Sequence, residues 1–355
     1  MNTYNRDDYF MFSSNCKITK GYNRSLIVDY LRKEVYYVPN EYYDLLQKID
    51  RNIINDIELL INDNSKKDFR EFILFLLENE IGFVTKNIQN FPKISDEVYE
   101  SNVLIKDMVI EIDSTLFNSE LKNRIYDEIN VIKCNDIQIK YISNYSKKDI
   151  QDLIGGFNAL DINYIELHIN TNPTIDLEFF NSLLESYAKL SHIYIYGKDE
   201  NKITPYFLNK DQYYPLHLGT VYYTKKDIND CEYCGVINKQ NLSFDNILIH
   251  NELFKTNGCL NKKVAIDRKG MIKNCLYMEE CYGNIKEQSI LTVLEKSNFK
   301  RFWSIKKDDI EVCKECEYRY SCTDCRAFIN DENNILSKPL KCKYNPYTNV
   351  WKDDN

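Results

Sequence analysis

The 355-residue sequence contains no long apolar run and no secretion-type start. No stretch approaches the roughly 20 consecutive apolar residues that a membrane-spanning helix needs. The opening MNTYNRDDYF also lacks the apolar core of a signal peptide. We therefore expect a soluble globular protein of the cytoplasm with no membrane partner. The net charge of −8 argues against nucleic acid as a general partner.

Common catalytic fingerprints are missing as well. The sequence has no P-loop, no dinucleotide-binding glycine pattern and no Ser/His/Asp set. Of its four histidines, we predict that His168 and His192 are hydrogen-bonded core residues, whereas His217 and His250 are candidates for metal binding. No catalytic residue can be named on this basis, and whether the protein is an enzyme is left open.

Cysteine, in contrast, is abundant and is concentrated near the end of the chain. Eight of the twelve cysteines fall between Cys259 and Cys342, and the stretch CKECEYRYSCTDC holds four of them. Two cysteines three residues apart can wrap around one metal ion or one corner of an iron–sulfur cluster. There are too many thiols for one metal and enough for two.

Disulfide bonds and zinc are the alternatives to iron–sulfur clusters at these cysteines. A disulfide framework is disfavoured because a chain of this length can bury its own core and carries no secretion signal. Zinc is an alternative at one or both sites, because four thiolates alone do not distinguish zinc from iron–sulfur. Cys231 and Cys234, in CEYCG, could form a thioredoxin-type redox pair, but the proline usual between such cysteines is absent.

The segment from residue 259 to 342 resembles a SPASM domain, the auxiliary-cluster module of radical SAM peptide-modifying enzymes. The family pattern is a cysteine, then a glycine with four residues before the next cysteine, then Cys-x2-Cys-x5-Cys-x3-Cys, and a last cysteine. Here Cys259 is followed by Gly270 and Cys275, and the later cysteines follow the same order. One spacing departs from the pattern, since two residues separate Cys322 from Cys325.

This resemblance implies two [4Fe–4S] clusters. One cluster would take Cys313, Cys316, Cys322 and Cys342. The other would take Cys259, Cys275 and Cys325, with Cys234 as the preferred fourth ligand and Cys281 and Cys231 in reserve. Charged side chains that flank the cysteines would donate hydrogen bonds or tune the clusters: Asp267, Arg319, Arg326 and Lys343.

The phrases CLNKKVAIDRKGMIKNC and CEYRYSCTDCRAF further resemble the SPASM partner of grasp-with-spasm systems. Such systems pair this protein with an ATP-grasp ligase and a small ribosomal precursor peptide. The resemblance implies a protein that binds and presents the precursor peptide to the ligase. The alternatives are a peptide-modifying enzyme that uses an auxiliary [4Fe–4S] cluster as a Lewis acid or redox site, and a zinc-stapled binding protein.

Residues 1–90 are predicted to form a small α+β unit. Strands are predicted at Phe10–Thr19, Ser25–Tyr30 and Glu34–Val38. Helices are predicted from Pro39-Asn40 to Ile49, at Ile53–Ile61 and at Asp68–Glu80, the last ended by Gly82. This order resembles the RiPP recognition element, a winged-helix-like module that adds a leader peptide to a sheet edge. We expect the receiving edge within residues 25–38, and a plain packing domain is the alternative.

A polar linker, residues 91–102, leads to a strand–helix alternation over residues 103–225. Strands are predicted at 103–113, 137–142, 164–169 and 192–197, and helices at Ser119–Ile132, Lys147–Leu160 and Phe179–Leu190. This α/β repeat resembles the partial (β/α) barrel of radical SAM enzymes, with residues 226–355 forming the SPASM domain.

The chemistry of that barrel is absent from the sequence. A radical SAM enzyme carries Cys-x3-Cys-x2-Cys after its first strand, but here the first strand runs into EIDSTLFNSELK. We therefore expect a degenerate core that neither binds SAM nor cleaves it reductively. Gly155-Gly156 is predicted to be a helix-packing feature, and Cys134 a buried small side chain.

Overall fold

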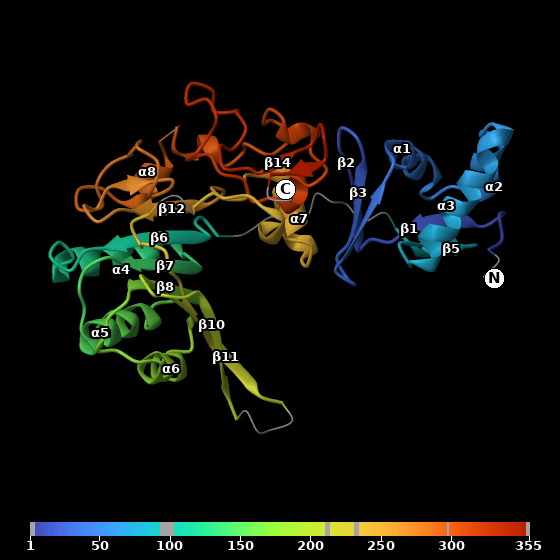
Figure 1. The fold of residues 1–355 in the computed structure, drawn as a ribbon. Coiled ribbons are helices and arrows are strands. Elements are labelled where there is room, and N and C mark those ends of the chain that lie inside the picture. The colour runs from blue at the N-terminus through green and yellow to red at the C-terminus, as the bar shows by residue number, and fades with distance from the viewer. Residues whose placement is uncertain (1–3, 93–102, 210–213, 231–233, 297, 353–355) are drawn as a thin grey trace. The chain divides into compact units, whose positions relative to one another are not determined.

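The computed structural model describes residues 4–92, 103–209, 214–230, 234–296 and 298–352 (Figure 1). The chain forms two compact units. Unit 1 comprises Met1–Glu100, Gly235–Gly258 and Ile305–Asn355, and unit 2 comprises Ser101–Cys234 and Cys259–Ser304. The cysteine-rich end of the sequence therefore contributes to both units. Across the described ranges, no helix has the length and apolarity that crossing a membrane requires.

The N-terminal part of unit 1 holds two antiparallel sheets. The smaller sheet pairs β1 (Tyr9–Phe12) with β5 (Gly82–Thr85). The larger sheet has the order β2 (Cys16–Lys20), β3 (Ser25–Asp29), β4 (Glu34–Val38). The first predicted strand is thus two strands, because a turn in which the Cys16 N–H donates to the Ser13 carbonyl interrupts it.

Three helices pack against these strands. They are α1 (Asn40–Ile49), α2 (Ile54–Leu59) and α3 (Lys66–Glu78). Phe10, Ile27, Leu46 and Ile73 are almost fully buried in their common core. The predicted order of strands followed by helices is confirmed, and the β1–β5 pair is an addition to it. The likeness to a winged-helix recognition element stays a prediction.

Gly82 does not end the third helix, as the sequence predicted. The helix ends at Glu78, and Glu80, with φ 53°, adopts the left-handed conformation after it. Gly82 lies in β5, where a Cβ atom would come within 2.3 Å of the Phe10 ring. The glycine is therefore required by the close approach of β1 rather than by a helix cap.

The other face of the β2–β3–β4 sheet packs against the C-terminal segment. Leu26, Val28 and Tyr30 share a core with Tyr318, Tyr344 and Trp351. Two polar contacts reinforce it: Arg24 Nε lies 2.8 Å from Glu317 Oε1, and the hydroxyls of Tyr37 and Tyr318 are 2.6 Å apart. Unit 1 also contains α7 (Ile247–Lys255), β14 (Tyr344–Asn345) and β15 (Val350–Trp351). The N-terminal sheet and the C-terminal cysteines thus form one packed body.

Unit 2 is built on an eight-stranded sheet with the order β10-β11-β9-β8-β7-β6-β12-β13. The six strands from β11 to β12 are parallel. The strands are β6 (Asp107–Ile112), β7 (Asp136–Tyr141), β8 (Tyr164–Asn170), β9 (Leu190–Tyr196), β10 (Lys202–Leu208), β11 (Leu216–Tyr223), β12 (Lys263–Ile266) and β13 (Ile272–Lys273). This mostly parallel α/β arrangement confirms the predicted strand–helix alternation, whereas a partial barrel stays a prediction.

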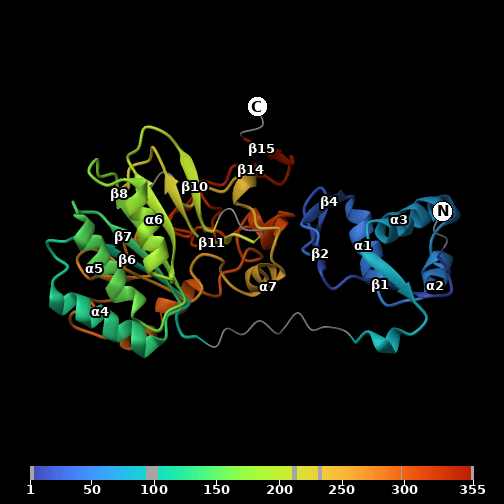
Figure 2. The same cartoon turned by 90° about the horizontal axis from the view of Figure 1, so that it is seen from below.

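The three crossover helices cover one face of this sheet (Figure 1; Figure 2). They are α4 (Ser119–Ile132), α5 (Lys147–Asn158) and α6 (Leu177–Ser186). Sequential parallel strands joined by right-handed crossovers place their helices on the same face. A shorter helix, α8 (Ile290–Leu294), adds Ile290, Val293 and Leu294 to the same core. The opposite face is left for polar side chains.

Two smaller predictions are settled in unit 2. Cys134 is fully buried, and its thiol lies 3.5 Å from the Asp136 carbonyl, as predicted for a small core side chain. Gly156 is confirmed as a packing residue, because a Cβ there would lie 2.2 Å from the Tyr126 hydroxyl. The β10–β11 hairpin was not predicted; Figure 1 shows it projecting beyond the rest of the sheet. Pro205 within β10 is tolerated because β10 is an edge strand.

Candidate functional site

Four of the predicted ligands come together in unit 1. We call Cys313, Cys316, Cys322 and Cys342 the first thiol group. Cys313 begins a 3-10 turn, η5 (Cys313–Glu315), which brings the Cys316 N–H to the Cys313 carbonyl at 2.9 Å. A second turn, η6 (Arg319–Ser321), directs the chain back to Cys322, and Cys342 is joined by a parallel bridge to Ile237. The thiols lie near enough for the charge of one to act on the pKa of the next.

Burial dominates the acidity of this group. Cys313 and Cys322 are only 7% and 8% exposed. Burial raises the pKa of Cys313 to about 11, although the Lys307 ammonium opposes it. Burial also raises the pKa of Cys316 and Cys322. These three thiols are therefore protonated when no metal is bound, and metal loading would release their protons.

A buried ion-pair network borders the first thiol group. The Lys307 ammonium lies 2.9 Å from Asp324 Oδ1 and 3.9 Å from Cys313 Sγ. Arg326 holds the same carboxylate with two hydrogen bonds of 2.8 Å. Burial acts to raise the pKa of Asp324, but Lys307 and Arg326 hold it below its ordinary value. Arg326 was predicted to flank a cluster; Lys307 and Asp324 were not.

The remaining flanking residues predicted from the sequence have separate roles. In unit 1, Arg319 bonds Asp308 at 3.0 Å and donates to the Cys316 carbonyl at 3.1 Å, so it braces the turn that carries a ligand. The Lys343 N–H donates to the Ile237 carbonyl beside Cys342. In unit 2, Asp267 accepts hydrogen bonds from the N–H groups of Lys269 and Met271 within a tight turn.

Three further cysteines gather in unit 2. We call Cys234, Cys259 and Cys275 the second thiol group. Their charges all act on Lys263, the first residue of β12. Cys259 contributes most to a raised pKa of this ammonium, burial opposes it, and Cys275, Asp107 and Cys234 add to it. One lysine therefore serves as the common cationic neighbour of these thiols.

Gly270 fits its place in the motif before Cys275. It closes the turn between β12 and β13 with φ 83°, and its N–H donates to the Asp267 carbonyl at 2.8 Å. A Cβ atom would lie 2.9 Å from the side-chain oxygen of Asn284. Only glycine combines this backbone conformation with this space.

The other predicted ligands are placed as follows. Cys325 is buried in unit 1 and lies against Gly235, where a Cβ atom would come within 2.5 Å of the Cys325 sulfur. Gly235 directly follows Cys234 in the chain. Cys281 is exposed, and Cys231 lies outside the described residues. No two of the described cysteines form a disulfide. The ligand assignments stay predictions.

The donor set of both groups is thiol, which suits iron–sulfur clusters or zinc. Over the described part of the chain, no three His, Cys, Asp or Glu side chains close around the position of one metal ion. A single zinc, with Zn–S bonds near ~2.3 Å, would require its sulfurs within roughly 4 Å of each other. A [4Fe–4S] cluster instead spreads its thiolates over separate irons.

The two histidines considered as metal ligands have other neighbours. His217 Nε2 lies 3.1 Å from the Thr220 hydroxyl within β11. His250, on α7, packs against the rings of Tyr30, Phe254 and Tyr320. Neither histidine joins a metal-ligand group in the ranges that the structure covers.

The face of the unit 2 sheet opposite the helices is polar. His168 on β8 lies 2.5 Å from Glu166 Oε1 through Nε2 and 2.8 Å from the Tyr196 hydroxyl through Nδ1. Its ring stacks on Tyr194, 4.6 Å away. Burial acts to raise the pKa of Glu166, but the hydrogen bonds from His168 and Gln138 lower it. The prediction of a hydrogen-bonded histidine is confirmed for His168.

His192 on β9 bonds the Tyr164 hydroxyl, so the hydrogen-bonding part of the second histidine prediction is confirmed. The two histidines are half-buried on the polar face, however, and not in the core. Burial lowers the pKa of His192, so it is neutral near pH 7. The polar face itself was missed. Its signal was the alternation in β7, β8 and β9, where every second residue is polar or aromatic. A sheet covered by apolar groups on both faces would not alternate.

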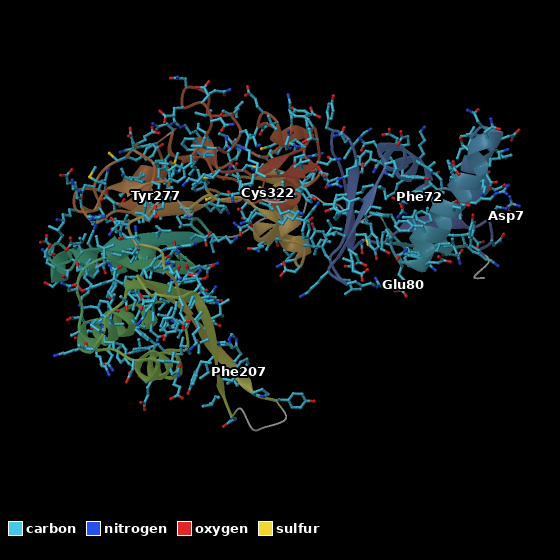
Figure 3. The ribbon with its side chains drawn as sticks, viewed as in Figure 1. Asp7, Phe72, Glu80, Phe207, Tyr277 and Cys322 are labelled. Carbon is cyan, nitrogen blue, oxygen red and sulfur yellow. The ribbon has the colours of Figure 1, made fainter. Side chains whose placement is uncertain are left out.

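A cavity of about 230 Å³ lies between this polar face and the second thiol group. Cys234 and Cys275 line it together with Lys263, His168 and Tyr196. Tyr277, labelled in Figure 3, forms part of the wall, and Lys140 lies 5.4 Å from the centre of its ring. The second thiol group therefore borders a space that a ligand could enter.

The loop after β6 contains a hydrogen-bonded turn. Asp113 Oδ1 accepts hydrogen bonds from the Thr115 N–H at 3.0 Å, the Thr115 hydroxyl at 2.8 Å and the Ser143 hydroxyl at 3.0 Å. These bonds lower the pKa of Asp113. Asp113 therefore fixes this turn, in which residues 113–118 contain no cysteine.

Comparisons with known proteins agree with the cysteine pattern. Residues 259–317 match the SPASM family model, described as an iron–sulfur cluster-binding domain. The AdoMet-dependent heme synthase of Oleidesulfovibrio alaskensis is 30% identical over 95 residues, 26% of this chain and 24% of that protein. The chain thus matches about a quarter of this relative's length.

Two solved structures also align with the chain. Streptococcus suis SuiB bound to S-adenosylmethionine gives a TM-score of 0.38 at 11% identity, over 93% of this chain and 98% of that chain. SuiB bound to the precursor peptide SuiA gives a TM-score of 0.37 at 11% identity, with the same coverage. The likeness is too weak to establish a shared fold.

Proposed function

We propose that this SPASM protein, related to the radical SAM enzymes, takes part in the maturation of a ribosomally synthesised peptide. It binds the precursor peptide and presents it to a partner ATP-grasp ligase, and it does not cleave SAM reductively. The observation that carries this proposal is that the first thiol group lies in the same compact unit as the N-terminal three-stranded sheet. Peptide capture and an iron–sulfur site would then belong to one body.

Two [4Fe–4S] clusters are the proposed cofactors. Cys313, Cys316, Cys322 and Cys342 would hold the first cluster. Cys234, Cys259 and Cys275, completed by Cys325, would hold the second. When bound, such clusters supply rigidity and can store or transfer an electron. The chain's own residues supply the buried ion pairs and turns that hold the thiols in place.

The precursor peptide would add to the edge of β4. The strand β3 is the centre of its sheet, so its two edges are already paired, whereas β4 pairs with β3 alone within the described residues. Edge addition draws affinity from main-chain hydrogen bonds and specificity from alternate side-chain pockets. Tyr37 on β4 contacts Tyr318, two residues after Cys316, so an added strand would lie close to the first thiol group.

The peptide proposal can be tested with a labelled leader and the whole chain. We expect micromolar dissociation, roughly −8 kcal/mol. Of two neighbouring residues in β4, only one directs its N–H to the free edge. Val35→Pro and Tyr36→Pro therefore form a matched pair, in which one variant should weaken leader binding and the other should destabilise the sheet. Unchanged binding in both variants would exclude β4 as the receiving edge.

The metal proposal is tested by analysis of protein purified without oxygen. We expect about eight irons and eight sulfides per chain, and no 5′-deoxyadenosine from SAM after reduction. Two zincs without sulfide would refute the iron–sulfur assignment. Turnover of SAM above a protein-free control would show that distant residues build a site the sequence does not reveal.

A second candidate function rests on the cavity beside the second thiol group. If Cys325 does not join this group, the cluster keeps one iron open to the cavity, and the protein could modify the peptide itself. The two candidates differ in the number of thiolates on the second cluster. If Cys325 is a ligand of the second cluster, Cys325→Ala should lower the iron and sulfide content. If it is not a ligand, both contents should stay unchanged.

A further inference from the structure

The ion-pair network beside Cys313 is more deeply buried than its composition would suggest. The side chains of Lys307, Asp324 and Arg326 are 4%, 1% and 0% exposed. Arg326 also donates to the carbonyls of Ile335 and Ser337, at 2.9 and 2.8 Å. Asn257 adds a hydrogen bond of 2.7 Å to Asp324. Every polar group of this network has a fixed partner in unit 1.

The network carries an excess of positive charge. Two cations share one carboxylate, and burying an unbalanced charge is costly. Two other acidic groups of unit 1 have cationic partners of their own: Asp308 lies 3.0 Å from Arg319, and Glu317 lies 2.8 Å from Arg24. The Lys307 ammonium also faces the first thiol group: the Cys313 sulfur lies 3.9 Å away, and the charge of Lys307 acts on Cys322 as well. An anionic metal-bound thiolate at this position would balance the network.

We infer that Lys307 is a fixed counter-cation of the cluster on the first thiol group, and that it makes reduction of this cluster more favourable. The inference rests on the proposed iron–sulfur function. Asp324 sets the direction of the ammonium, because it holds Lys307 on the side of the network that faces Cys313. Lys307 acts through a ligand and touches no substrate, so it is a positioning residue.

The reduction concerned is a one-electron step. Dithionite supplies the electron and is itself oxidised to sulfite, the cluster gains one negative charge, and no bond to a cysteine forms or breaks. A buried positive charge favours the state with the additional negative charge. Its effect is large because little water is present to screen it.

The test compares four forms of the whole chain, purified without oxygen: wild type, Lys307→Met, Lys307→Arg and Lys314→Met. Lys307→Met should still fold, because Asp324 keeps both bonds from Arg326 and the bond from Asn257. Lys314 provides the matched control, since it adjoins Cys313 in sequence but is exposed. The midpoint of each cluster is measured by dithionite titration followed by electron paramagnetic resonance.

We expect Lys307→Met to shift one cluster's reduction equilibrium at least tenfold toward the oxidised form, which is about 59 mV for one electron. The other cluster serves as an internal control and should not move. Lys307→Arg should restore most of the shift, and Lys314→Met should change little. Unmoved midpoints in Lys307→Met, or an equal shift in Lys314→Met, would overturn the inference.

Loss of the cluster from Lys307→Met is also informative. Iron retention then replaces the midpoint as the readout, and Lys307→Gln provides a donor without charge. Retention in Lys307→Arg but not in Lys307→Gln supports a counter-cation, whereas equal loss in all three variants overturns it. Zinc without sulfide in the wild type would refute the proposed function itself, so the two failures can be told apart.

Discussion

The two thiol groups differ in what surrounds them. The first is closed: its cysteines sit among tight turns, and the buried Lys307–Asp324–Arg326 network borders it. The second is open: Cys234 and Cys275 line a cavity that the polar sheet face also lines. A closed site suits retention of a cluster and electron storage, whereas an open site suits contact with a ligand. If the protein performs chemistry on a peptide, the second group is where we expect it.

Replacement of single cysteines should give the largest effect, and it should distinguish the two thiol groups by cluster content and stability. Cys316→Ala should lose the first cluster, about four irons, and with it much of the stability of unit 1, because metal binding contributes folding free energy. Cys275→Ala should lose the second cluster but leave unit 1 folded. Iron and sulfide analysis together with thermal unfolding measures both. Equal loss of stability in the two variants would contradict the contrast between a closed and an open site.

Much of the fold could be predicted because the local signals agree with the tertiary structure. The helix predicted to begin at Lys147 does begin there, behind a Ser146 cap, and Pro39 precedes α1 as predicted. The predictions failed where a long-range contact decides the outcome. Glycine is a common helix terminator, which is why Gly82 was predicted to end a helix. Its position in a strand is instead determined by close contact with the Phe10 ring, 72 positions earlier.

Of the candidate site, only the cysteines could be predicted from the sequence. Cysteine spacing reveals thiols that share a turn, such as Cys313 and Cys316. It does not reveal Lys307, because a lysine six residues before a motif is typical of a surface residue. Its burial depends on Asp324 and on Asn257, which lies 50 positions upstream. Nor does spacing show that Cys234, Cys259 and Cys275 belong to a different unit from Cys313.

A substitution in the core shared by the N-terminal sheet and the C-terminal segment should give the second-largest effect. Trp351 is 3% exposed and packs on Tyr344 and Tyr318 in the core shared with β3. Trp351→Ala should cost about 3–5 kcal/mol of unfolding free energy, because it leaves a large cavity. Val350→Ala, at a side chain that is 44% exposed, is the control. Urea unfolding measures the free energy of unfolding of both variants. An equally small loss in the two would contradict the shared core.

A smaller effect concerns unit 2 and depends on pH. Glu111 lies 2.8 Å from Arg268 and 3.2 Å from Lys140, on the polar side of β6. Burial acts to raise the pKa of Glu111, but Arg268 and Lys140 hold it below its ordinary value of 4.5. A carboxyl group with a lowered pKa stabilises the fold above its unfolded-state pKa, and this contribution disappears as the pH falls through the folded-state value.

Glu111→Gln should therefore cost about 2–3 kcal/mol near pH 7, because two cations lose a buried partner. The cost is at the low end for a broken buried pair because Arg268 is 41% exposed. The difference from wild type should shrink as the pH falls below 4.5. Glu120→Gln, at an exposed position in the first turn of α4, controls for loss of charge. Urea unfolding across the pH range measures the difference, and a gap that grows in acid would have the wrong sign.

The smallest effect is local and should leave both thiol groups unchanged. Ser146 and Asp149 form a capping box at the start of α5: the Asp149 N–H donates to the Ser146 hydroxyl at 3.2 Å, and the Ser146 N–H donates to the Asp149 carboxylate at 2.8 Å. Ser146→Ala should lower the free energy of unfolding by about 1 kcal/mol, because the reciprocal hydrogen bonds of the capping box are broken. Ser119→Ala is a matched control, since the cap of α4 is Asn118 and not the serine after it. Hydrogen exchange of residues 147–158 should rise about fivefold in the first variant only, with the iron content constant in both. Equal exchange in the two variants would show that the capping box does not stabilise α5, and a loss of iron from Ser146→Ala would show that the second thiol group is coupled to the crossover helices on the far side of the sheet.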